Sequence, residues 1–546
     1  MKIALLQCNS VTGDVVGNEE RILAFVRAAR CADADLCITP ELALSGVAPG
    51  RFLRTADFGE GLLSALERLA EHLMNGPALL LGCPVPSQYG RWRFSNAAVL
   101  ISEGRWQVIS RKVAHRDGDV GAGDFEPGVS CGIMQYSGWR FGVVLSGETP
   151  SEEGSFWNIQ DFGEHSPLSD LLRRGVDAIV YMAGAPWHIG AQSACERALS
   201  GIAARHHVHV FAVNLVGGND SCVYNGQSMA VDSTGRLYGR ARAFDEEMLL
   251  VETTGSQSSV ALRGDSDEEN LWNALVLGTR DFVRQCGVNR VLVGLSGGMD
   301  SALVCCIAKE ALGAESVIAV MMPSPYSSEG SLTDARSLAE NLGLPTPITI
   351  PIEALMRSFF TSLAPGMGLF PPYEAETTFE NLQARIRAVI LSTLANRAQA
   401  MILNTSNKSE GAMGYSTLYG DTVGALAVIG DVTKSQVYAL ARWYNAHHGR
   451  EILPQAIFDK QPSAELRPGQ KDSDSLPPYD ILDPLLEKLL ADGSREENLC
   501  NASRDIQSRL FKAEFKRRQE PLPLIVSKTP FGEVWRVPVA GRYRPV

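Results

Sequence analysis

The stretch Val291-Leu292-Val293-Gly294-Leu295-Ser296-Gly297-Gly298-Met299-Asp300-Ser301 decides the fold of the second half of the chain. An apolar run of strand type ends in Ser-Gly-Gly-x-Asp-Ser, and a helix-compatible run, Ala302 to Leu312, follows at once. The glycines allow a tight turn that brings several N–H groups round one anion, and the helix adds its positive end. A bare Gly-Gly turn would suit any strand–turn–helix, whereas the full pattern favours a polyphosphate site in which Asp300 can hold Mg²⁺.

Patterns typical of strands and helices alternate around this loop. Strands are expected at Val291–Leu295, Val317–Met322, Ile348–Ile352 and Ala400–Asn404, and helices at Ala302–Leu312, Leu332–Leu342 and Phe379–Asn396. This rhythm predicts a doubly wound parallel sheet. In such a sheet a nucleotide lies beyond the carboxyl ends of the strands, which is where the glycine loop falls.

The first half of the chain has a different organisation. Many short apolar strand patterns occur in residues 1–254, and helical spacing near 3.6 occurs at 19–32, 62–74 and 193–206. Residues 255–269 are polar and rich in Ser, Gly and Asp, which suggests a linker. We therefore expect two domains, 1–254 and 270–546.

The composition of the 546 residues limits the class of protein. Hydrophobic residues make up 45% and charged residues 21%, as in ordinary globular proteins. The net charge of -12, from 50 basic and 62 acidic residues, argues against broad nucleic-acid binding. No apolar run is long enough for a membrane span, no signal-peptide core begins the chain, and the 11 cysteines lack metal-binding spacing. A cytoplasmic protein with reduced thiols is expected.

The glycine loop resembles the pyrophosphate loop of the N-type ATP pyrophosphatases, which include asparagine, GMP and argininosuccinate synthetases and tRNA-modifying ligases. Seven further segments narrow the resemblance: Met322-Pro323-Ser324-Pro325-Tyr326-Ser327-Ser328, Glu380-Asn381-Leu382-Gln383-Ala384-Arg385-Ile386-Arg387, Asn407-Lys408-Ser409-Glu410, Gly414-Tyr415-Ser416-Thr417-Leu418-Tyr419-Gly420-Asp421, Asp431-Val432-Thr433-Lys434, Lys460-Gln461-Pro462-Ser463-Ala464-Glu465-Leu466-Arg467-Pro468 and Lys516-Arg517-Arg518-Gln519. In this order they are similar to the synthetase domain of the glutamine-dependent NAD synthetases. The resemblance covers about 270 to 546.

This resemblance implies an ATP-dependent amidation. The nicotinate carboxylate of deamido-NAD (nicotinic acid adenine dinucleotide) attacks the α-phosphate of ATP, pyrophosphate leaves, and ammonia displaces AMP from the adenylate. The implied residues are Gly294, Leu295, Ser296, Gly297, Gly298, Met299, Asp300, Ser301, Thr405 and Ser463 for ATP, Asn381, Glu410 and Lys516 for deamido-NAD, Asp300 and Glu410 for Mg²⁺, and Lys434 as a catalytic cation at the phosphates. Ser463 belongs to a loop that covers phosphate in the relatives, and the two roles of Glu410 stay open.

Three segments of the first half resemble the nitrilase superfamily, whose fold is a pair of stacked sheets with helices outside. Thr39-Pro40-Glu41-Leu42 resembles the segment that supplies a catalytic Glu, and Ser110-Arg111-Lys112 the one that supplies a catalytic Lys. The family's Gly-x-x-x-Cys is Gly142-Val143-Val144-Leu145-Ser146 here. The resemblance thus implies a Glu41–Lys112–Ser146 site in which serine takes the place of the nucleophilic cysteine.

The serine changes the chemistry that this site can perform. A thiol with a pKa near 8.5 can be held as thiolate by neighbouring charge, whereas a hydroxyl needs an aligned base during attack. The sequence departs from the family elsewhere too: Gly147 and Glu148 replace Glu-Asp, Gln192 replaces a Lys, and the segment from Lys112 to Phe125 is about two residues short. We expect glutaminase activity to be lost or very low, with Glu41 and Lys112 kept as a buried ion pair.

Other readings of the sequence stay open. The chain could be a different amide-forming ATP pyrophosphatase, the first half could be a non-catalytic assembly module, and Cys131 is the nearest other cysteine that could act as nucleophile. In the main reading, ammonia is free or comes from a separate glutaminase partner. The resemblance also implies a homo-oligomer, and the substrates are small molecules.

Overall fold

The computed structural model describes residues 1–87, 94–113, 125–146, 167–253, 266–370, 377–491, 501–532 and 534–541. Two compact units, Met1–Asn270 and Leu271–Val546, make up the chain. Gly147 and Glu148, and the interior of the segment between Lys112 and Phe125, lie outside the described residues. No helix in the described ranges is both long and apolar enough to cross a membrane.

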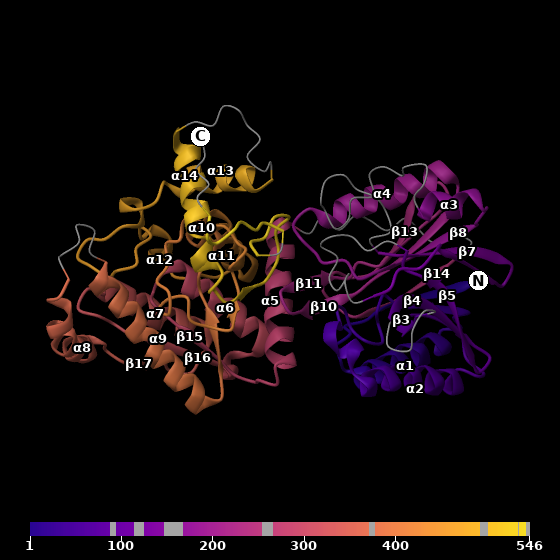
Figure 1. Cartoon of the computed structure of the whole chain (residues 1–546), viewed down its shortest axis with the longest axis horizontal. Helices are drawn as coiled ribbons and strands as arrows, with labels where there is room; N and C mark the ends of the chain where they lie inside the picture. Colours follow the sequence, from indigo (N-terminus) through magenta and orange to yellow (C-terminus); the bar gives the residue numbers. More distant parts are fainter. Residues whose placement is uncertain are drawn as a thin grey trace. The chain divides into compact units, whose positions relative to one another are not determined.

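Two six-stranded sheets form the centre of the first unit (Figure 1). In spatial order one sheet holds β14 (Glu247–Glu252), β1 (Lys2–Gln7), β2 (Leu36–Ile38), β3 (Ala78–Pro86), β4 (Phe94–Ser102) and β5 (Arg105–Arg111). The other holds β13 (Leu237–Arg240), β12 (Met229–Val231), β9 (His209–Asn214), β8 (Ala178–Ala183), β7 (Trp139–Leu145) and β6 (Gly132–Tyr136). A separate hairpin pairs β10 (Val216–Asn219) with β11 (Cys222–Asn225).

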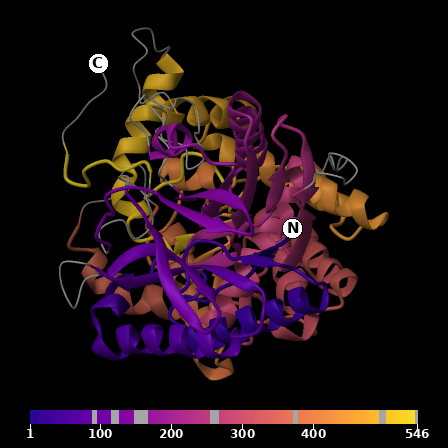
Figure 2. The same ribbon diagram turned by 90° about the vertical axis from the view of Figure 1, so that its right-hand side faces the viewer.

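Helices cover the outer faces of both sheets. The helices α1 (Val15–Cys31) and α2 (Ala56–His72), with the short η1 (Gly50–Arg54) before α2, lie beside the first sheet, and α3 (Pro167–Arg173) and α4 (Ala191–His206) lie beside the second. Figure 2 views this unit from another side, with the indigo helices below the strands. Alternate residues of β1 divide between the two interfaces: Ile3 and Leu5 pack between the sheets, and Ala4 and Leu6 pack against the helices. This four-layer sandwich confirms the fold expected from the nitrilase-like segments.

A six-stranded parallel sheet forms the second unit. Its order is β17 (Ile348–Thr349), β16 (Val317–Met321), β15 (Val291–Gly294), β18 (Met401–Asn404), β19 (Leu426–Ala427) and β20 (Leu522–Pro523). From β15 the chain winds one way to β17 and then returns to β18 on the other side of β15, so the sheet is doubly wound as the sequence predicts. The reversal places the glycine loop, at the carboxyl end of β15, beside the switch point.

The helices of this unit pack on both faces of the sheet. They are α5 (Asp267–Gln285), α6 (Met299–Leu312), α7 (Glu329–Leu342), α8 (Glu353–Met367), α9 (Thr378–Ala398), α10 (Lys408–Met413), α11 (Lys434–His448), α12 (Gln455–Asp459), α13 (Tyr479–Ala491), α14 (Asn501–Lys512) and α15 (Glu514–Arg517), with short η3 (Ala314–Ser316) and η4 (Asp472–Asp474). Leu292 of β15 packs with Leu391 of α9, while right-handed crossovers bring α6 and α7 to the opposite face.

The second unit has more helices than the sequence prediction gave, since α5, α8 and α10 to α15 were not expected, and α6 has a different start. The helix α6 begins at Met299 rather than Ala302, because Gly298 is its N-cap, so Met299, Asp300 and Ser301 form its first turn. The helix α8 was not predicted, since Pro365 and Gly366 near its end read as a helix breaker.

Candidate functional site

A cavity of about 310 Å³ lies at the carboxyl ends of the parallel strands of the second unit. The glycine loop, the first turn of α6 and the starts of α10 and α11 form its polar wall. Residues of α9, β16 and β18 form its apolar wall, and the segment 460–472 also lines it. The elements that the sequence predicted around a polyphosphate site therefore converge on one cavity.

Serine hydroxyls organise the backbone of the glycine loop. The N–H of Ser296 donates to Ser301 Oγ at 3.2 Å, and the N–H of Gly298 donates to Ser296 Oγ at 3.2 Å. Gly297 has φ +79°, and a Cβ there would come within 2.2 Å of the Ser331 carbonyl oxygen, so only glycine fits. The first-turn N–H groups of α6 have no acceptor within the helix. The loop thus presents donors and a helix dipole to an anion.

An ion-pair triad stands opposite this loop. Lys434, 4% exposed in its side chain, places Nζ 2.5 Å from Asp300 Oδ2 and 2.9 Å from Glu410 Oε1. Asn407 connects the two carboxylate segments, because its Nδ2 donates to Asp300 Oδ1 at 3.2 Å and its Oδ1 accepts from the N–H of Glu410 at 3.0 Å. The ring of Tyr479 covers the Lys434 ammonium at 5.5 Å. Two acids and one base leave this cluster with one formal negative charge.

Burial and charge shift these groups in opposite directions. Burial raises the pKa of Glu410, an effect that Lys434 opposes and Asp300 reinforces. Burial lowers the pKa of Lys434, but the two carboxylates outweigh it, so its pKa is raised. The cluster therefore holds a permanent ammonium beside a carboxylate that protonates readily.

The donor set at this cluster fits a magnesium ion that also binds phosphate. Mg²⁺ takes one or two carboxylates and completes its shell with substrate phosphate and water. Asp300 and Glu410 supply the two carboxylates and both line the cavity. Among the described residues no group of three or more His, Cys, Asp or Glu side chains could hold a metal, so the other ligands would not come from these side chains.

Apolar residues and one arginine form the other wall of the cavity. Ala384, Ala388 and Leu391 share one face of α9 and line it, together with residues of β16 and β18. Arg387 projects from the same face, and its Nε donates to the Met322 carbonyl oxygen at 3.0 Å. Burial lowers the pKa of Arg387 to about 10, although Glu465 and Asp421 oppose this. An apolar wall with one half-buried cation suits a ligand that joins an aromatic nucleotide base to an anionic group.

The segment 460–472 is fastened to the start of α7 by one carboxylate. Glu465 Oε1 accepts from Ser328 Oγ and Ser331 Oγ, each at 2.9 Å, and pairs with Lys460 Nζ at 2.7 Å. Lys460 Nζ also bonds to Ser331 Oγ. Glu465 has φ +48°, a conformation that a non-glycine residue adopts rarely. A strained residue thus holds this segment against α7.

Most of the predicted nucleotide residues line the cavity. Those that do are Gly294, Leu295, Ser296, Gly298, Met299, Asp300, Ser301, Thr405, Glu410, Lys434 and Ser463. Gly297 shapes the loop from behind, against Ser331. Asn381 accepts from Thr417 Oγ1 at 2.8 Å, and Lys516 Nζ donates to the carbonyls of Gly414 and Ser416 at 2.7 and 2.6 Å, so both contact the segment that follows α10. These two are not in the lining of this cavity.

The three residues predicted for the first unit also meet. Glu41 follows β2, Lys112 follows β5 and Ser146 follows β7, and each is less than 10% exposed. Lys112 Nζ donates to Glu41 Oε1 at 3.0 Å, which is the ion pair expected from the sequence. Ser146 Oγ donates to Glu41 Oε2 and accepts from the N–H of Gly184 at 3.4 Å.

A fourth side chain, that of Asn96, also contacts Glu41. Asn96 Nδ2 donates to Glu41 Oε1 at 2.5 Å, the same oxygen that Lys112 contacts. The second oxygen, Oε2, also accepts from the N–H of Ser146 at 3.2 Å. Both carboxylate oxygens of Glu41 are therefore already engaged by donors other than the Ser146 hydroxyl. Gln192, the residue that the nitrilase-like resemblance singled out, accepts from Asn225 Nδ2 at 3.2 Å.

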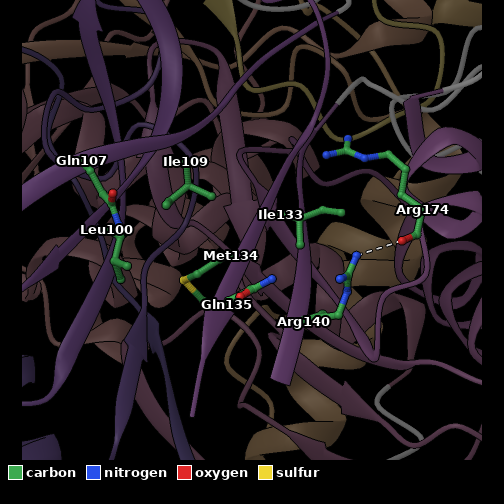
Figure 3. Close-up of a pocket in the computed structure, with 8 residues that line it drawn as sticks. All are labelled: Leu100, Gln107, Ile109, Ile133, Met134, Gln135, Arg140 and Arg174. Atoms are coloured by element: carbon green, nitrogen blue, oxygen red, sulfur yellow. Dashed lines mark hydrogen bonds between the residues drawn. The ribbon is translucent and has the colours of Figure 1, made fainter. Parts of the chain in front are cut away.

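The first unit contains a hollow of its own, whose charged side chains bond to the backbone and leave it without the chemistry of the synthetase cavity. It measures about 650 Å³ and lies between β4 and β5 of one sheet and β6 and β7 of the other (Figure 3). Figure 3 shows Arg140 bonded to the backbone oxygen of Arg174, at 2.9 Å. Arg174 in turn donates to the Cys131 carbonyl oxygen at 2.9 Å, so both guanidinium groups form hydrogen bonds to backbone carbonyl oxygens.

Comparison with known proteins identifies the family of each half of the chain. The sequence pattern of the NAD synthase family matches residues 271–520, and that of the carbon-nitrogen hydrolases matches residues 2–144. The glutamine-dependent NAD(+) synthetase of Synechocystis sp. is 40% identical over 100% of this chain and 99% of its own length. The chain belongs to the glutamine-dependent NAD(+) synthetase family. The Thermotoga maritima protein of that name is 34% identical over 100% of this chain and 99% of its own.

Solved structures of NAD synthetases share the complete architecture. The glutamine-dependent enzyme from Acinetobacter baumannii, in complex with ADP, has a TM-score of 0.76 at 29% identity and covers 98% of both chains. That from Cytophaga hutchinsonii has a TM-score of 0.81 at 18% identity over 99% of this chain and 98% of its own, which shows the shared fold. The chain is thus a ligase with a nitrilase-like domain and an NAD synthase domain.

Sequence reasoning missed five charged residues of the synthetase cavity: Arg387, Asp421, Lys460, Glu465 and Asp472. All but Asp472 lie in segments that carry the resemblance to NAD synthetases, yet none was given a role. The signal for Arg387 was available, since helical spacing from Ala384 to Leu391 puts it on the buried face of α9. Nothing in the sequence indicates that Glu465 contacts α7, because that contact joins residues more than 130 positions apart.

Proposed function

We propose that this chain makes NAD by amidating deamido-NAD with ATP and ammonia, releasing AMP and pyrophosphate. The observation that carries the proposal is the cavity in which the donors of the glycine loop face Asp300, Glu410 and Lys434. The names of the relatives support the reaction, and the Acinetobacter baumannii enzyme was solved with an adenine nucleotide.

The residues of the chain divide the work between binding and charge stabilisation. The loop from Ser296 to Ser301 holds the leaving pyrophosphate through its N–H groups, and Thr405 and Ser463 contact ATP from the opposite side. Asn381 and Lys516 bind deamido-NAD, with Glu410 at the boundary between the two substrates. Because both reactants are anions, the main task of the protein is to bring them together and offset their charge.

Lys434 contacts the two carboxylates placed on the metal and lies where it can also bind phosphate. Asp300 and Glu410 would hold Mg²⁺, which when bound supplies positive charge to the phosphate oxygens. The Lys434 ammonium, which shares these carboxylates in the structure, then turns to the phosphates. Exclusion of water by the segment 460–472 protects the adenylate until ammonia attacks.

The nitrogen donor of this chain is ammonia rather than glutamine. The position where the nitrilase superfamily carries its nucleophilic cysteine is Ser146, whose hydroxyl meets a carboxylate already occupied by Lys112 and Asn96. No histidine in the part of the chain that the structure describes contacts this hydroxyl, whereas an alcohol nucleophile needs an aligned base of that kind for attack. The nitrilase-like domain acts in assembly, and ammonia is free or arrives from a partner glutaminase.

Two measurements test this proposal. The purified chain, given deamido-NAD, ATP, Mg²⁺ and ammonium chloride, should form AMP and NAD in equal amounts; absence of NAD would overturn the synthetase assignment. With glutamine in place of ammonium, the rate should fall to the level without donor. S146C is the matched variant, because a gain of glutamine hydrolysis in S146C alone would identify the hydroxyl as the cause.

The proposal also covers the domain boundaries and the oligomeric state of the chain. We place the domains at 1–254 and 270–546 with a linker at 255–269, and expect the chain to form a homo-oligomer, dimer or larger. Sedimentation measures the oligomer number directly. If a different acid were the substrate, pyrophosphate release with a panel of carboxylates would reveal it.

A further inference from the structure

Arg387 reaches from α9 into the wall of the nucleotide cavity. Its Nε donates to the carbonyl oxygen of Met322, the residue that follows β16, at 3.0 Å. Its neighbours on the same face of α9, Ala384, Ala388 and Leu391, line the cavity with it. The guanidinium is thus fixed by one bond at the carboxyl end of the strand beside the glycine loop.

Arg387 is the one cation in the described lining of this cavity that has no carboxylate in an ion pair. Lys434 pairs with two carboxylates, and Lys460 pairs with Glu465 at 2.7 Å. In the described part of the chain, Arg387 has no carboxylate within ion-pair distance, and its one side-chain hydrogen bond is that from Nε. Burial lowers its pKa to about 10, although the charges of Glu465 and Asp421 oppose this. A guanidinium that lines a cavity and takes part in no ion pair keeps N–H donors for an anionic ligand.

We propose that Arg387 binds a phosphate group of ATP in the synthetase site. A guanidinium presents several N–H donors in one plane, and this geometry matches phosphate oxygens in a bidentate contact. ATP fits better than the phosphates of the dinucleotide, because the loop from Ser296 to Ser301, placed on the phosphates of ATP, lines the same cavity. Of the three residues placed on deamido-NAD, only Glu410 lines it, and Asn381 and Lys516 do not. The inference rests on the proposed function and adds a binding residue to it.

Binding calorimetry of the full chain with ATP and Mg²⁺ tests this inference. R387Q removes the charge and should weaken ATP binding about 10- to 100-fold, the range for a lost charge-assisted hydrogen bond to phosphate. R387K keeps the charge without the planar fork and should fall between R387Q and wild type. R397Q, an exposed arginine in the last turn of the same helix, should bind as wild type does. The affinity for deamido-NAD should change less than about threefold in each variant.

The alternatives give different results in the same experiment. If Arg387 only supports the Met322 carbonyl, R387Q lowers Tm but binds ATP with the wild-type dissociation constant, and the inference is wrong. If the loss falls on deamido-NAD alone, the assignment to ATP is wrong. If wild type itself fails to bind ATP, the proposed function fails together with the inference, so the wild-type titration separates the two failures.

Discussion

Removal of the Lys434 ammonium tests the charge balance of the synthetase site. In K434M, the carboxylates of Asp300 and Glu410 lose the cation that lies 2.5 and 2.9 Å from them. At an effective dielectric constant of about 20, such a pair about 3 Å apart attracts by on the order of 5 kcal/mol. Desolvation offsets most of this, so the net loss of stability on removing one partner is about 3–5 kcal/mol.

Thermal unfolding measures this loss. For a domain of this size, about 3–5 kcal/mol corresponds to a fall in Tm of roughly 6–15 °C. K309M is the matched control, because Lys309 pairs with Glu310 at 2.8 Å with both side chains about 30% exposed; its loss should stay below about 1 kcal/mol. Mg²⁺ without nucleotide should raise the Tm of K434M more than that of wild type, since the metal would neutralise the same two carboxylates.

The pH dependence gives a second readout of K434M. Lys434 is the group that lowers the pKa of Glu410 against burial, so its removal raises that pKa further. A carboxyl with a raised folded pKa contributes stability at low pH that is lost as pH rises. K434M should therefore lose more stability at pH 8.5 than at pH 6. A fall in Tm no larger than that of K309M, at both pH values, would refute the reasoning.

Two further predictions concern the segment that closes the cavity. E465A removes the contacts to Ser328 and Ser331, so water should reach the adenylate and AMP should exceed NAD in the products. The control is D459N, which changes an exposed carboxylate next to the segment and should keep the ratio of AMP to NAD at one. An AMP-to-NAD ratio of one in E465A would contradict the role of the contact. Burial raises the pKa of Asp472, with Lys434 opposing, so its charged form costs stability as pH rises above its unfolded pKa. D472N should therefore gain in Tm relative to wild type between pH 4 and pH 7, and a constant difference would argue against a buried charge there.

Local patterns predicted the parts of the fold that depend on neighbours in sequence. The Ser-Gly-Gly-x-Asp-Ser pattern indicated a strand, a turn and a helix, and these are β15, the loop and α6. Its first helical turn was placed in the loop, because the Gly298 N-cap depends on backbone angles that residue types do not fix. The helix α8 was missed although Leu355, Phe359 and Leu363 recur at helical spacing, because Pro365 and Gly366 interrupt the pattern near its end.

The site was predictable only where one short segment supplies its chemistry. The glycine loop is such a segment, and the pairing of Glu41 with Lys112 followed from two strand ends of a recognised fold. The charge state of Lys434 was not predictable, because its two partners come from α6 and α10. The role of Glu465 also depends on a long-range contact, with α7. Contacts between distant segments, such as that of Glu465 with α7, are therefore what residue types alone did not reveal.

Isotope competition tests the central claim most directly. The purified chain would turn over deamido-NAD and ATP with ¹⁵N-ammonium and an excess of unlabelled glutamine, and mass spectrometry would measure the nitrogen in the product amide. The account predicts NAD whose amide nitrogen is ¹⁵N throughout, because Ser146 cannot release ammonia from glutamine. NAD carrying mainly unlabelled nitrogen would contradict it, and no NAD at all would contradict the synthetase function.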